Sequence, residues 1–366
     1  MLRTRSWRTR IFSQVGVLIL LGLARIPLPL LNNPQSGWDR DALGMLDHAQ
    51  ALPWGYVSYP PMAPFLARIA LVLFGPSLIG MRLFASLAIA AVMALAGLIA
   101  RELGGGRLAQ ALAALATGIS PIQLLAGTMI SYSSFDCLWW VSTAYLVIRL
   151  LKSADARWWL AIGLVFGLGM MTKHLFAILI AGVVIGVLLA PARRFLRTPW
   201  LWAGAALCLF LILPNLAWQI RHGFISLELM RWIHGRGVLI GRTASFIPEQ
   251  FYFSANLAAI PVWIAGLVIC LAGGRSQKFR ILAWMGVIPL ALRSTYRAAH
   301  TIWPRHTRCS SQPAPWSPNP GWPGSHLAAP ALRASSDPWF WRQADGLRRD
   351  RAPGRTRELG LVGCRQ

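Results

Sequence analysis

The stretch WWLAIGLVFGLGMMTKHLFAILIAGVVIGVLLA, residues 158–190, is apolar except for Lys173 and His174 near its middle. An α-helix rises about 1.5 Å per residue, so one helix of this length would overshoot the hydrocarbon core of a bilayer, which is about 30 Å thick. Two short helices that meet at Lys173 would fit that core and would bring the lysine to one membrane face. The stretch therefore predicts a helical membrane protein with a broken helix pair that carries a charge.

The composition points to the same class of protein. Only 13% of the 366 residues are charged, 18 are tryptophan, and the mean hydropathy is +0.50, whereas soluble domains carry about 25% charged residues. Apolar spans fall near residues 11–31, 78–100, 108–129, 136–151, 158–171, 174–190, 200–220, 255–273 and 279–292. We therefore predict an all-α polytopic membrane protein, a bundle of about nine or more transmembrane helices. The first span has a basic head like a signal peptide, but no small-residue cleavage site follows it, so we expect it to be retained.

Arginine and lysine indicate which side each connection faces. The basic connections are residues 1–10, 101–107, 149–157, 191–199 and 273–280, and they alternate with connections at 32–61, 131–136, Lys173 and 221–250. The positive-inside rule places the basic group in the cytoplasm, which puts Asp41, Asp136 and Lys173 together on the outer side. Because the arginines lie in such loops and in the C-terminal part, the net charge of +24 does not indicate a nucleic-acid partner.

Lys173 has two interpretations. A lysine in a hairpin can extend along its apolar stem to the outer headgroups without any further role. Alternatively it is a fixed cation that binds a lipid phosphate, since ionisable residues at membrane depth are commonly functional and an ammonium is a compact charge suited to phosphate. His174 is either an assistant in that site or a structural hydrogen-bonding residue.

The acidic residues on the outer side also have two interpretations each. Asp136 opens the fourth span, where a helix N-terminus favours a carboxylate for structural reasons, but the same position holds it at the outer membrane surface. Asp39, Asp41 and Asp47 gather in the first outer loop although the whole chain has only 12 acidic residues. A solvated loop explains them simply, whereas a functional carboxylate there would act as a general base toward an acceptor hydroxyl or amine. The five cysteines show no metal-ligand or CxxC spacing, and we expect neither a metal nor a cofactor.

A series of motifs then resembles a known family. The sequence contains DALGMLDHAQALPWGYVSYPPMAPFLARIALVLFGPSLIGMRLFASLAIA (41–90), RELGGGRLAQ (101–110), FDCLWW (135–140), TKH (172–174), LRTPWLW (196–202) and LPNLAWQIRHG (213–223). This order of motifs, over about residues 11–290, resembles the dolichyl-phosphate-mannose-protein mannosyltransferase-like enzymes of the GT-C superfamily, a group that includes the aminoarabinose transferases of lipid A. The resemblance covers far more than any single motif does.

The resemblance implies a GT-C-type bundle and an inverting glycosyltransferase of the bacterial inner membrane whose active site faces the periplasm. The donor would be a polyprenyl-phosphate sugar, and the acceptor a lipid, a glycan or a protein. By this resemblance Asp41 is the catalytic base, Lys173 binds the donor phosphate, and Arg82 is a second, weaker candidate for the phosphate. The chain departs from the family at two positions: Ala42 stands where the family has glutamate, and Tyr59 where it has the histidine of its HPP motif. Asp47 is a candidate substitute for that glutamate.

The expected organisation has three parts. Residues 1–10 form a cytoplasmic basic N-terminus, residues 11–292 form the glycosyltransferase-like membrane domain with its first periplasmic loop at 32–61, and residues 293–366 form a tail rich in Arg, Pro, Ser and Gly. The tail is either disordered or, as we prefer, the product of a shifted reading frame, because the predicted topology would otherwise place a strongly basic segment outside.

Two rival functions stay open at this point. Ala42 and the unusual tail favour a catalytically impaired protein that binds or carries a lipid-linked sugar. An unrelated secondary transporter is the other rival, although such transporters often contain inverted repeats and the sequence shows none. Donor turnover by the purified protein separates an enzyme from both.

Overall fold

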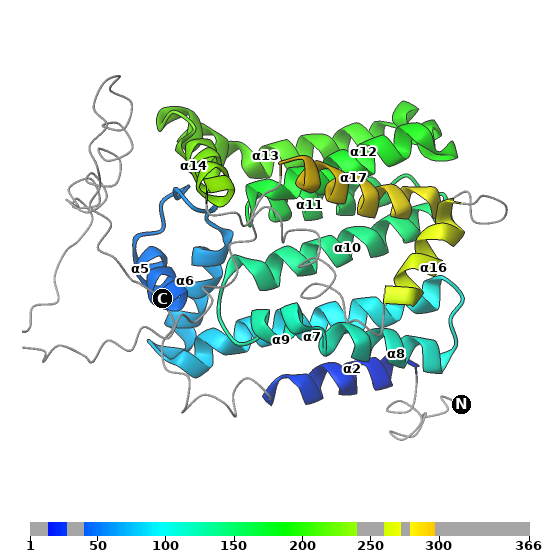
Figure 1. Cartoon of the computed structure of the whole chain (residues 1–366), viewed down its shortest axis with the longest axis horizontal. Helices are drawn as coiled ribbons and strands as arrows, with labels where there is room; N and C mark the ends of the chain where they lie inside the picture. The colour runs from blue at the N-terminus through cyan, green and yellow to red at the C-terminus, as the bar shows by residue number, and fades with distance from the viewer. Residues whose placement is uncertain (1–13, 28–39, 240–259, 272–278, 297–366) are drawn as a thin grey trace, which may run out of the picture. The chain divides into compact units, whose positions relative to one another are not determined.

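A computed structural model of the chain describes residues 14–27, 40–239, 260–271 and 279–296. Within these ranges the chain forms helices and turns and contains no strand (Figure 1). The α-helices are α2 (Gln14–Arg25), α5 (Arg40–Ala51), α6 (Met62–Phe74), α7 (Leu78–Glu102), α8 (Arg107–Gly118), α9 (Pro121–Ala126), α10 (Tyr132–Ser153), α11 (Trp158–Met170), α12 (Ala177–Leu189), α13 (Pro199–Arg221), α14 (Ile225–Leu239), α16 (Ile260–Leu271) and α17 (Arg280–Tyr296), with 3-10 turns at His174–Phe176 and Pro191–Arg197. The basic N-terminus, Asp39 and most of the tail lie outside the described residues.

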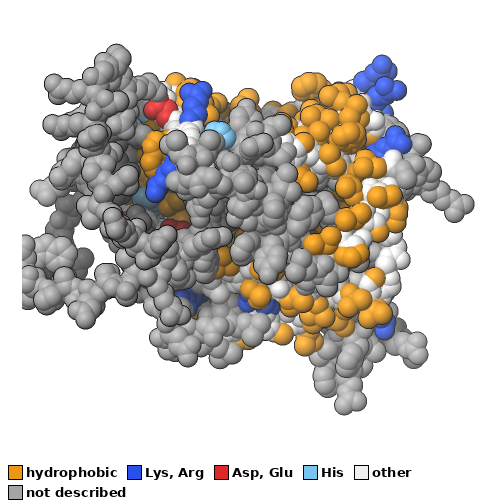
Figure 2. Space-filling view, viewed as in Figure 1, with side chains coloured by type: hydrophobic (Ala, Val, Ile, Leu, Met, Phe, Trp, Pro, Cys, Tyr) orange, Lys and Arg blue, Asp and Glu red, His pale blue; other side chains and the backbone are white. Residues whose placement is uncertain are grey.

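The helices confirm the predicted class of all-α polytopic membrane protein. Among the described residues, α7, α10 and α13 are long and apolar enough to cross a membrane, and several shorter helices are also apolar. Apolar side chains cover much of the described surface that is visible in Figure 2. On α13, for example, Trp202 and Phe210 are exposed, as expected for a helix whose outer side contacts lipid rather than water.

The predicted break at Lys173 is present. α11 ends at Met170, a 3-10 turn occupies His174–Phe176, and α12 begins at Ala177, while Lys173 itself is extended with φ of −155°. α11 and α12 have 13 residues each, so each is about 20 Å long. Neither half overshoots a bilayer, which is the physical reason for the break.

Other boundaries differ from the prediction. The span predicted at 108–129 is two helices, α8 and α9, because Pro121 lacks a backbone donor and disfavours helical geometry at Ser120. The outer loop predicted at 32–61 contains the helix α5, and α6 follows it as an apolar helix that the predicted spans omitted. The outer connection at 221–250 contains α14. Hydropathy alone merges or misses such short elements.

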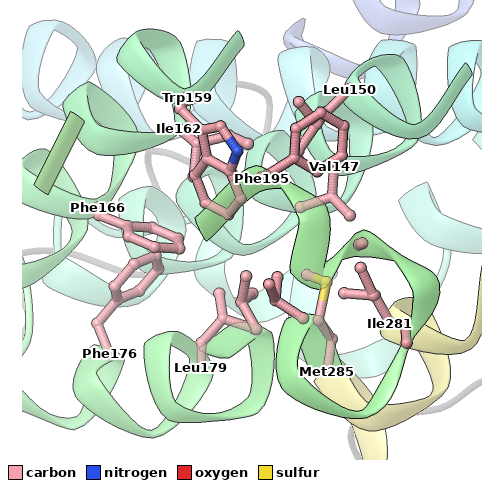
Figure 3. Close-up of a cluster of buried hydrophobic side chains, with 14 residues drawn as sticks. Val147, Leu150, Trp159, Ile162, Phe166, Phe176, Leu179, Phe195, Ile281 and Met285 are labelled. Carbon is pink, nitrogen blue, oxygen red and sulfur yellow. The ribbon is translucent and has the colours of Figure 1, made fainter. Parts of the chain in front are cut away.

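One hydrophobic cluster joins the two halves of the broken pair (Figure 3). Phe166 of α11 meets Phe176 of the turn edge to face, with 6.3 Å between ring centroids. Leu179 of α12 and Ile281 of α17 complete the contact on the other side, and both are fully buried. This packing fixes the angle at the break and therefore the position of Lys173.

Two glycines let α11 and α13 touch backbone to backbone. A methyl group added to Gly163 would collide with the backbone of Gly204, and one on Gly204 would collide with the Trp159 carbonyl. The close approach leaves no room for any side chain at either position. This contact holds α13, and with it the motif at its C-terminal end, against the broken pair.

Gly163→Ala is therefore expected to lower the thermal stability of the purified protein, because overpacking of this kind costs about 1–3 kcal/mol. Gly286→Ala in α17 is the matched control, since a methyl group there meets open space and alanine favours a helix over glycine. Melting temperatures in the same detergent compare the two variants. Equal melting temperatures would show that the contact between α11 and α13 is loose.

A second cluster packs the elements that carry the candidate site residues. Its buried members come from α5, α6, α7, the residue Ile130 and α10, and they are Met45, Ala49, Ala63, Ala67, Ala70, Met81, Ala88, Ile130 and Phe135. Tyr59 and Tyr132 are partly buried against it. The cluster thus supports the first outer loop directly beside the start of α10.

Ion pairs mark the opposite end of α7 and α10. Glu102 at the end of α7 binds Arg149 at 3.2 Å and Lys152 at 2.6 Å, both near the end of α10. Asp136 lies thirteen residues before Arg149 along the same helix, which is about 20 Å. The basic connections at 101–107 and 149–157 therefore share one end of the helices, and Asp136 lies toward the other.

Candidate active site

Lys173 and Asp136 face each other at the helix break. The Lys173 Nζ lies 3.9 Å from Asp136 Oδ2 and 4.7 Å from the centroid of the Tyr132 ring. The side chains of the lysine and the aspartate are 19% and 13% exposed, so water screens the pair only in part. The arrangement concentrates a positive charge beside a carboxylate and an aromatic face.

The start of α10 explains why Tyr132 and Asp136 act on the same lysine. Residues four apart lie on one face of a helix, and Tyr132 and Asp136 have this spacing in the first turns of α10. Trp139 continues the same helix, and its Nε1 donates a hydrogen bond of 2.9 Å to Thr172 Oγ1. Since Thr172 precedes Lys173, α10 holds the break from one side.

The first outer loop holds the break from the other side. The Met62 backbone amide donates to the Met171 carbonyl at 3.0 Å. His174 Nε2 donates to Asn215 Oδ1 at 3.2 Å, and Asn215 Nδ2 donates to the Trp54 carbonyl at 2.8 Å. His174 is thus a link between the break, α13 and the loop, which is the structural role considered for it from the sequence.

The motifs WGY and LPNLAWQ meet in this loop. A side chain on Gly55 would collide with the Trp218 ring of α13, so the motif needs a glycine there. Gln219 Nε2 donates to Ser226 Oγ at 2.6 Å, and Ser226 Oγ donates to the Tyr56 carbonyl at 3.1 Å. Two sequence motifs more than 150 residues apart therefore form one support for the loop.

Asp41 lies on α5, at the edge of this assembly, with an exposed side chain. Burial raises the pKa of Tyr59 above its ordinary value, and the nearby Tyr56 and the negative charge of Asp41 add to this shift. The negative charges of Asp41 and Asp136 both lie near Tyr132. These residues form a group around Tyr132: Lys173 and Tyr59 lie against its ring, and the charges of Asp41 and Asp136 act on it.

The remaining candidates are not part of this group. Asp47 is exposed and, six residues after Asp41, it points about 120° away from it around α5. Ala42, which stands at the family's glutamate position, is buried with 3% exposure. Arg82 is also buried, next to Met81 of the second cluster.

Three residues in or beside the group were missed from the sequence, namely Tyr132, His48 and Asn215. Tyr132 was detectable, because its spacing of four from Asp136 predicts a shared helix face. The Nδ1 atom of His48 lies 2.6 Å from the Tyr59 hydroxyl. His48 was detectable only if α5 had been recognised as a helix, because it follows Asp41 by seven residues, about two helical turns, and would then lie on the same helix face. Asn215 gave no signal, because its partners Trp54 and His174 are distant in sequence.

The chemistry available to this group is binding of an anion beside a general base. Lys173 can hold a phosphate through charge-assisted contacts, and the exposed Asp41 can accept a proton from a reacting hydroxyl. Within the described ranges, no three His, Cys, Asp or Glu side chains gather as a metal ion would require.

Comparisons with known proteins agree with the motifs. Residues 58–218 match the family described as dolichyl-phosphate-mannose-protein mannosyltransferase. The chain is also 24% identical over 307 residues to the lipid A galacturonosyltransferase RgtD of Rhizobium johnstonii, an alignment that covers 79% of this chain and 62% of the relative. The resemblance to the GT-C mannosyltransferase-like family is thereby confirmed.

The matched regions contain most of the site. Asp136, Lys173 and Tyr59 lie within residues 58–218, whereas Asp41 and His48 precede that range. The chain spans less than two thirds of the length of the galacturonosyltransferase.

Proposed function

We propose that this chain is an inverting glycosyltransferase that moves a sugar from a polyprenyl-phosphate donor to an acceptor at the outer face of the bacterial inner membrane. The proposal rests on one observation above all. Lys173, a cation at a helix break, lies beside Tyr132 and Asp136, and the charge of Asp41 acts on the same tyrosine. The shared neighbour Tyr132 supports a site in which Lys173 binds the phosphate and Asp41 is the carboxylate base.

The reaction is a single displacement. Asp41 takes the proton from the acceptor hydroxyl, whose oxygen attacks the anomeric carbon as the bond from that carbon to the phosphate oxygen breaks. The leaving phosphate keeps the bonding electrons and gains negative charge. Lys173 offsets that charge, and a fixed cation does so most strongly where water is partly excluded.

The acceptor is a glycolipid in this proposal. The name of the similar galacturonosyltransferase specifies lipid A, and an acceptor held in the outer leaflet would reach a site at the membrane surface. The alternative function is a catalytically impaired binder or carrier of lipid-linked sugars, which the buried Ala42 at the family's glutamate position favours.

Turnover of the donor by the full chain, purified and reconstituted in lipid nanodiscs, tests the proposal. A polyprenyl-phosphate galacturonic acid is the probe, with a lipid A acceptor, and release of polyprenyl phosphate is measured. Release that depends on the acceptor supports an enzyme. Binding of the donor without release would support the binder instead.

Labelling of single cysteines tests which side the site faces. In a background without native cysteines, Gln35→Cys and Ser133→Cys are expected to react with a membrane-impermeant maleimide in intact spheroplasts. Arg194→Cys, in the 3-10 turn between α12 and α13, is expected to react only after permeabilisation, because its basic connection belongs inside. Reaction of Arg194→Cys in intact spheroplasts would reverse the topology and move the chemistry to the cytoplasm.

A further inference from the structure

His48 and Tyr59 form a short hydrogen bond beside the proposed donor site. The His48 Nδ1 lies 2.6 Å from the Tyr59 hydroxyl oxygen. Tyr56 holds the histidine from two directions, since its ring lies 4.4 Å from the His48 ring and its hydroxyl donates to the His48 carbonyl at 2.6 Å. The histidine is therefore fixed in orientation, with Nδ1 aimed at Tyr59.

Tyr59 connects this histidine to Lys173. The Tyr59 ring lies 5.7 Å from the Tyr132 ring, and the Lys173 ammonium sits over that second ring. If the donor phosphate binds Lys173, one of its two substituents, the polyprenyl chain or the sugar, lies next to Tyr59. The polyprenyl chain belongs among apolar side chains and lipid, whereas the polar pair of His48 and Tyr59 suits the sugar. Tyr59 is half-buried and can contact such a group.

The protonation state and the tautomer of His48 together decide what Tyr59 can offer that sugar. Burial lowers the pKa of His48 below its ordinary value, and the nearby Asp47 opposes this shift, so the imidazole is neutral at pH 7. A neutral ring that accepts at Nδ1 carries its proton on Nε2, and Tyr59 must then donate its only hydrogen to His48. The free lone pair of the Tyr59 oxygen can only accept a further hydrogen bond.

We propose that His48 is a positioning residue that holds Tyr59 as a hydrogen-bond acceptor for a hydroxyl group of the donor sugar. This inference rests on the proposed function, because it takes the ligand at Lys173 to be a sugar phosphate. Tyr59 touches the substrate, and His48 acts through it. Protonation of His48 reverses the polarity, because Nδ1–H then donates to the Tyr59 oxygen and the phenol hydrogen turns toward the sugar hydroxyl.

The described surroundings leave few other groups that titrate in the same range. Asp47 shares α5 with His48, and Tyr56 and Tyr59 keep their protons because burial raises the pKa of both. The adjoining helix α6 contributes apolar residues to the cluster against α5, namely Ala63, Leu66, Ala67, Ala70 and Leu71, while its Arg68 is exposed. Beyond Tyr59 lie Asp41, Tyr132, Asp136 and Lys173.

The hydrogen bond can be observed without catalysis. In the full chain labelled with ¹⁵N-histidine, the resonance of His48 is assigned by its loss in His48→Phe. We expect an Nε2–H tautomer with Nδ1 as acceptor at pH 7.5, and a shifted Nδ1 resonance in Tyr59→Phe. An Nδ1–H tautomer in the native protein, or a spectrum unchanged by Tyr59→Phe, would overturn the inference.

Donor binding tests the role of the pair. The dissociation constant of polyprenyl-phosphate galacturonic acid is expected to rise about 2- to 10-fold in Tyr59→Phe at pH 7.5, the effect of one hydrogen bond. In the native protein the dissociation constant is expected to change as the pH falls through the pKa of His48, because Tyr59 then donates to the sugar hydroxyl instead of accepting from it. His48→Phe, which keeps a ring against Tyr56, and Tyr59→Phe are both expected to remove that pH dependence. Pronounced pH dependence in either variant would contradict the inference.

Polyprenyl phosphate without a sugar is the control ligand at pH 7.5, where its affinity should be equal in the native protein and in Tyr59→Phe. Equal weakening of both ligands would show a structural role instead. The pH series uses only the sugar-linked phosphate, since a phosphate monoester itself titrates near pH 6. If the donor binds with the expected pH dependence but is never turned over, the proposed enzyme fails while this inference stands.

Discussion

Asp41→Asn is expected to reduce the turnover of the polyprenyl-phosphate sugar by roughly 10²–10⁴-fold, the usual contribution of a general base. Asparagine keeps the size of the side chain and much of its hydrogen bonding but cannot take up the proton of the acceptor hydroxyl. Donor affinity should change little, because Asp41 lies on α5 and not beside the Lys173 ammonium. Single-turnover rates and donor dissociation constants, measured on the same preparation, separate the two quantities.

Asp47→Asn is the matched control for this variant. Asp47 lies on the same helix, and its substitution removes the same charge, but its side chain points about 120° away from Asp41 around α5. The turnover of the donor by Asp47→Asn should therefore stay near the native value. A normal rate in Asp41→Asn would move the base to Asp39 or Asp47, and a loss in Asp47→Asn would identify which.

Lys173→Met is expected to weaken both donor binding and rate. Methionine keeps an apolar stem of similar length but removes the charge, and a hydrogen bond to a charged group contributes about 1.5–3 kcal/mol, which is roughly 10- to 100-fold in affinity. The rate of the bound donor should fall as well, because the leaving phosphate loses its counter-charge. The partner Asp136 would also be left in a partly buried position without this cation.

Lys152→Met serves as the control for the loss of one lysine. Lys152 binds Glu102 at the opposite end of α7 and α10, far from the break. Its exposed ion pair should contribute less than 1 kcal/mol to stability and nothing to donor affinity. Native donor affinity and a native turnover rate in Lys173→Met would show that Lys173 only extends to the outer headgroups and has no role in the reaction.

The sequence predicted the class of fold because the apolar runs are long and the charged residues few. The break at Lys173 was predictable for the same reason: residues 158–190 are too long for one span and carry their only charge near the middle. The short helices α5, α6, α9 and α14 were not predictable from hydropathy. Their residues are either mixed in polarity or too few to form a span, so tertiary contacts decide whether they become helices.

The candidate site, like the fold, was predictable from the sequence only in part. The predicted topology alone brought Asp41, Asp136 and Lys173 to one side, whereas Tyr132 was missed although its spacing of four from Asp136 predicts a shared helix face. Spacing alone left open which acidic residue of the first outer loop belongs to the group, and only the family resemblance favoured Asp41. Asp41 and Asp47 are both exposed on α5 and point about 120° apart around that helix, and the charge of Asp41 acts on Tyr132.

The sequence by itself determined that the chain crosses a membrane as helices, that its long apolar run breaks at a lysine, and that its motifs resemble those of GT-C glycosyltransferases. These properties depend on composition and on local spacing, which act over one or two helical turns. Only the tertiary structure decided that His48 meets Tyr59, that Asn215 joins Trp54 to His174, and that Lys173 lies over Tyr132. Each of these contacts depends on how separate elements pack, and no local pattern in the sequence specifies the distance between two elements.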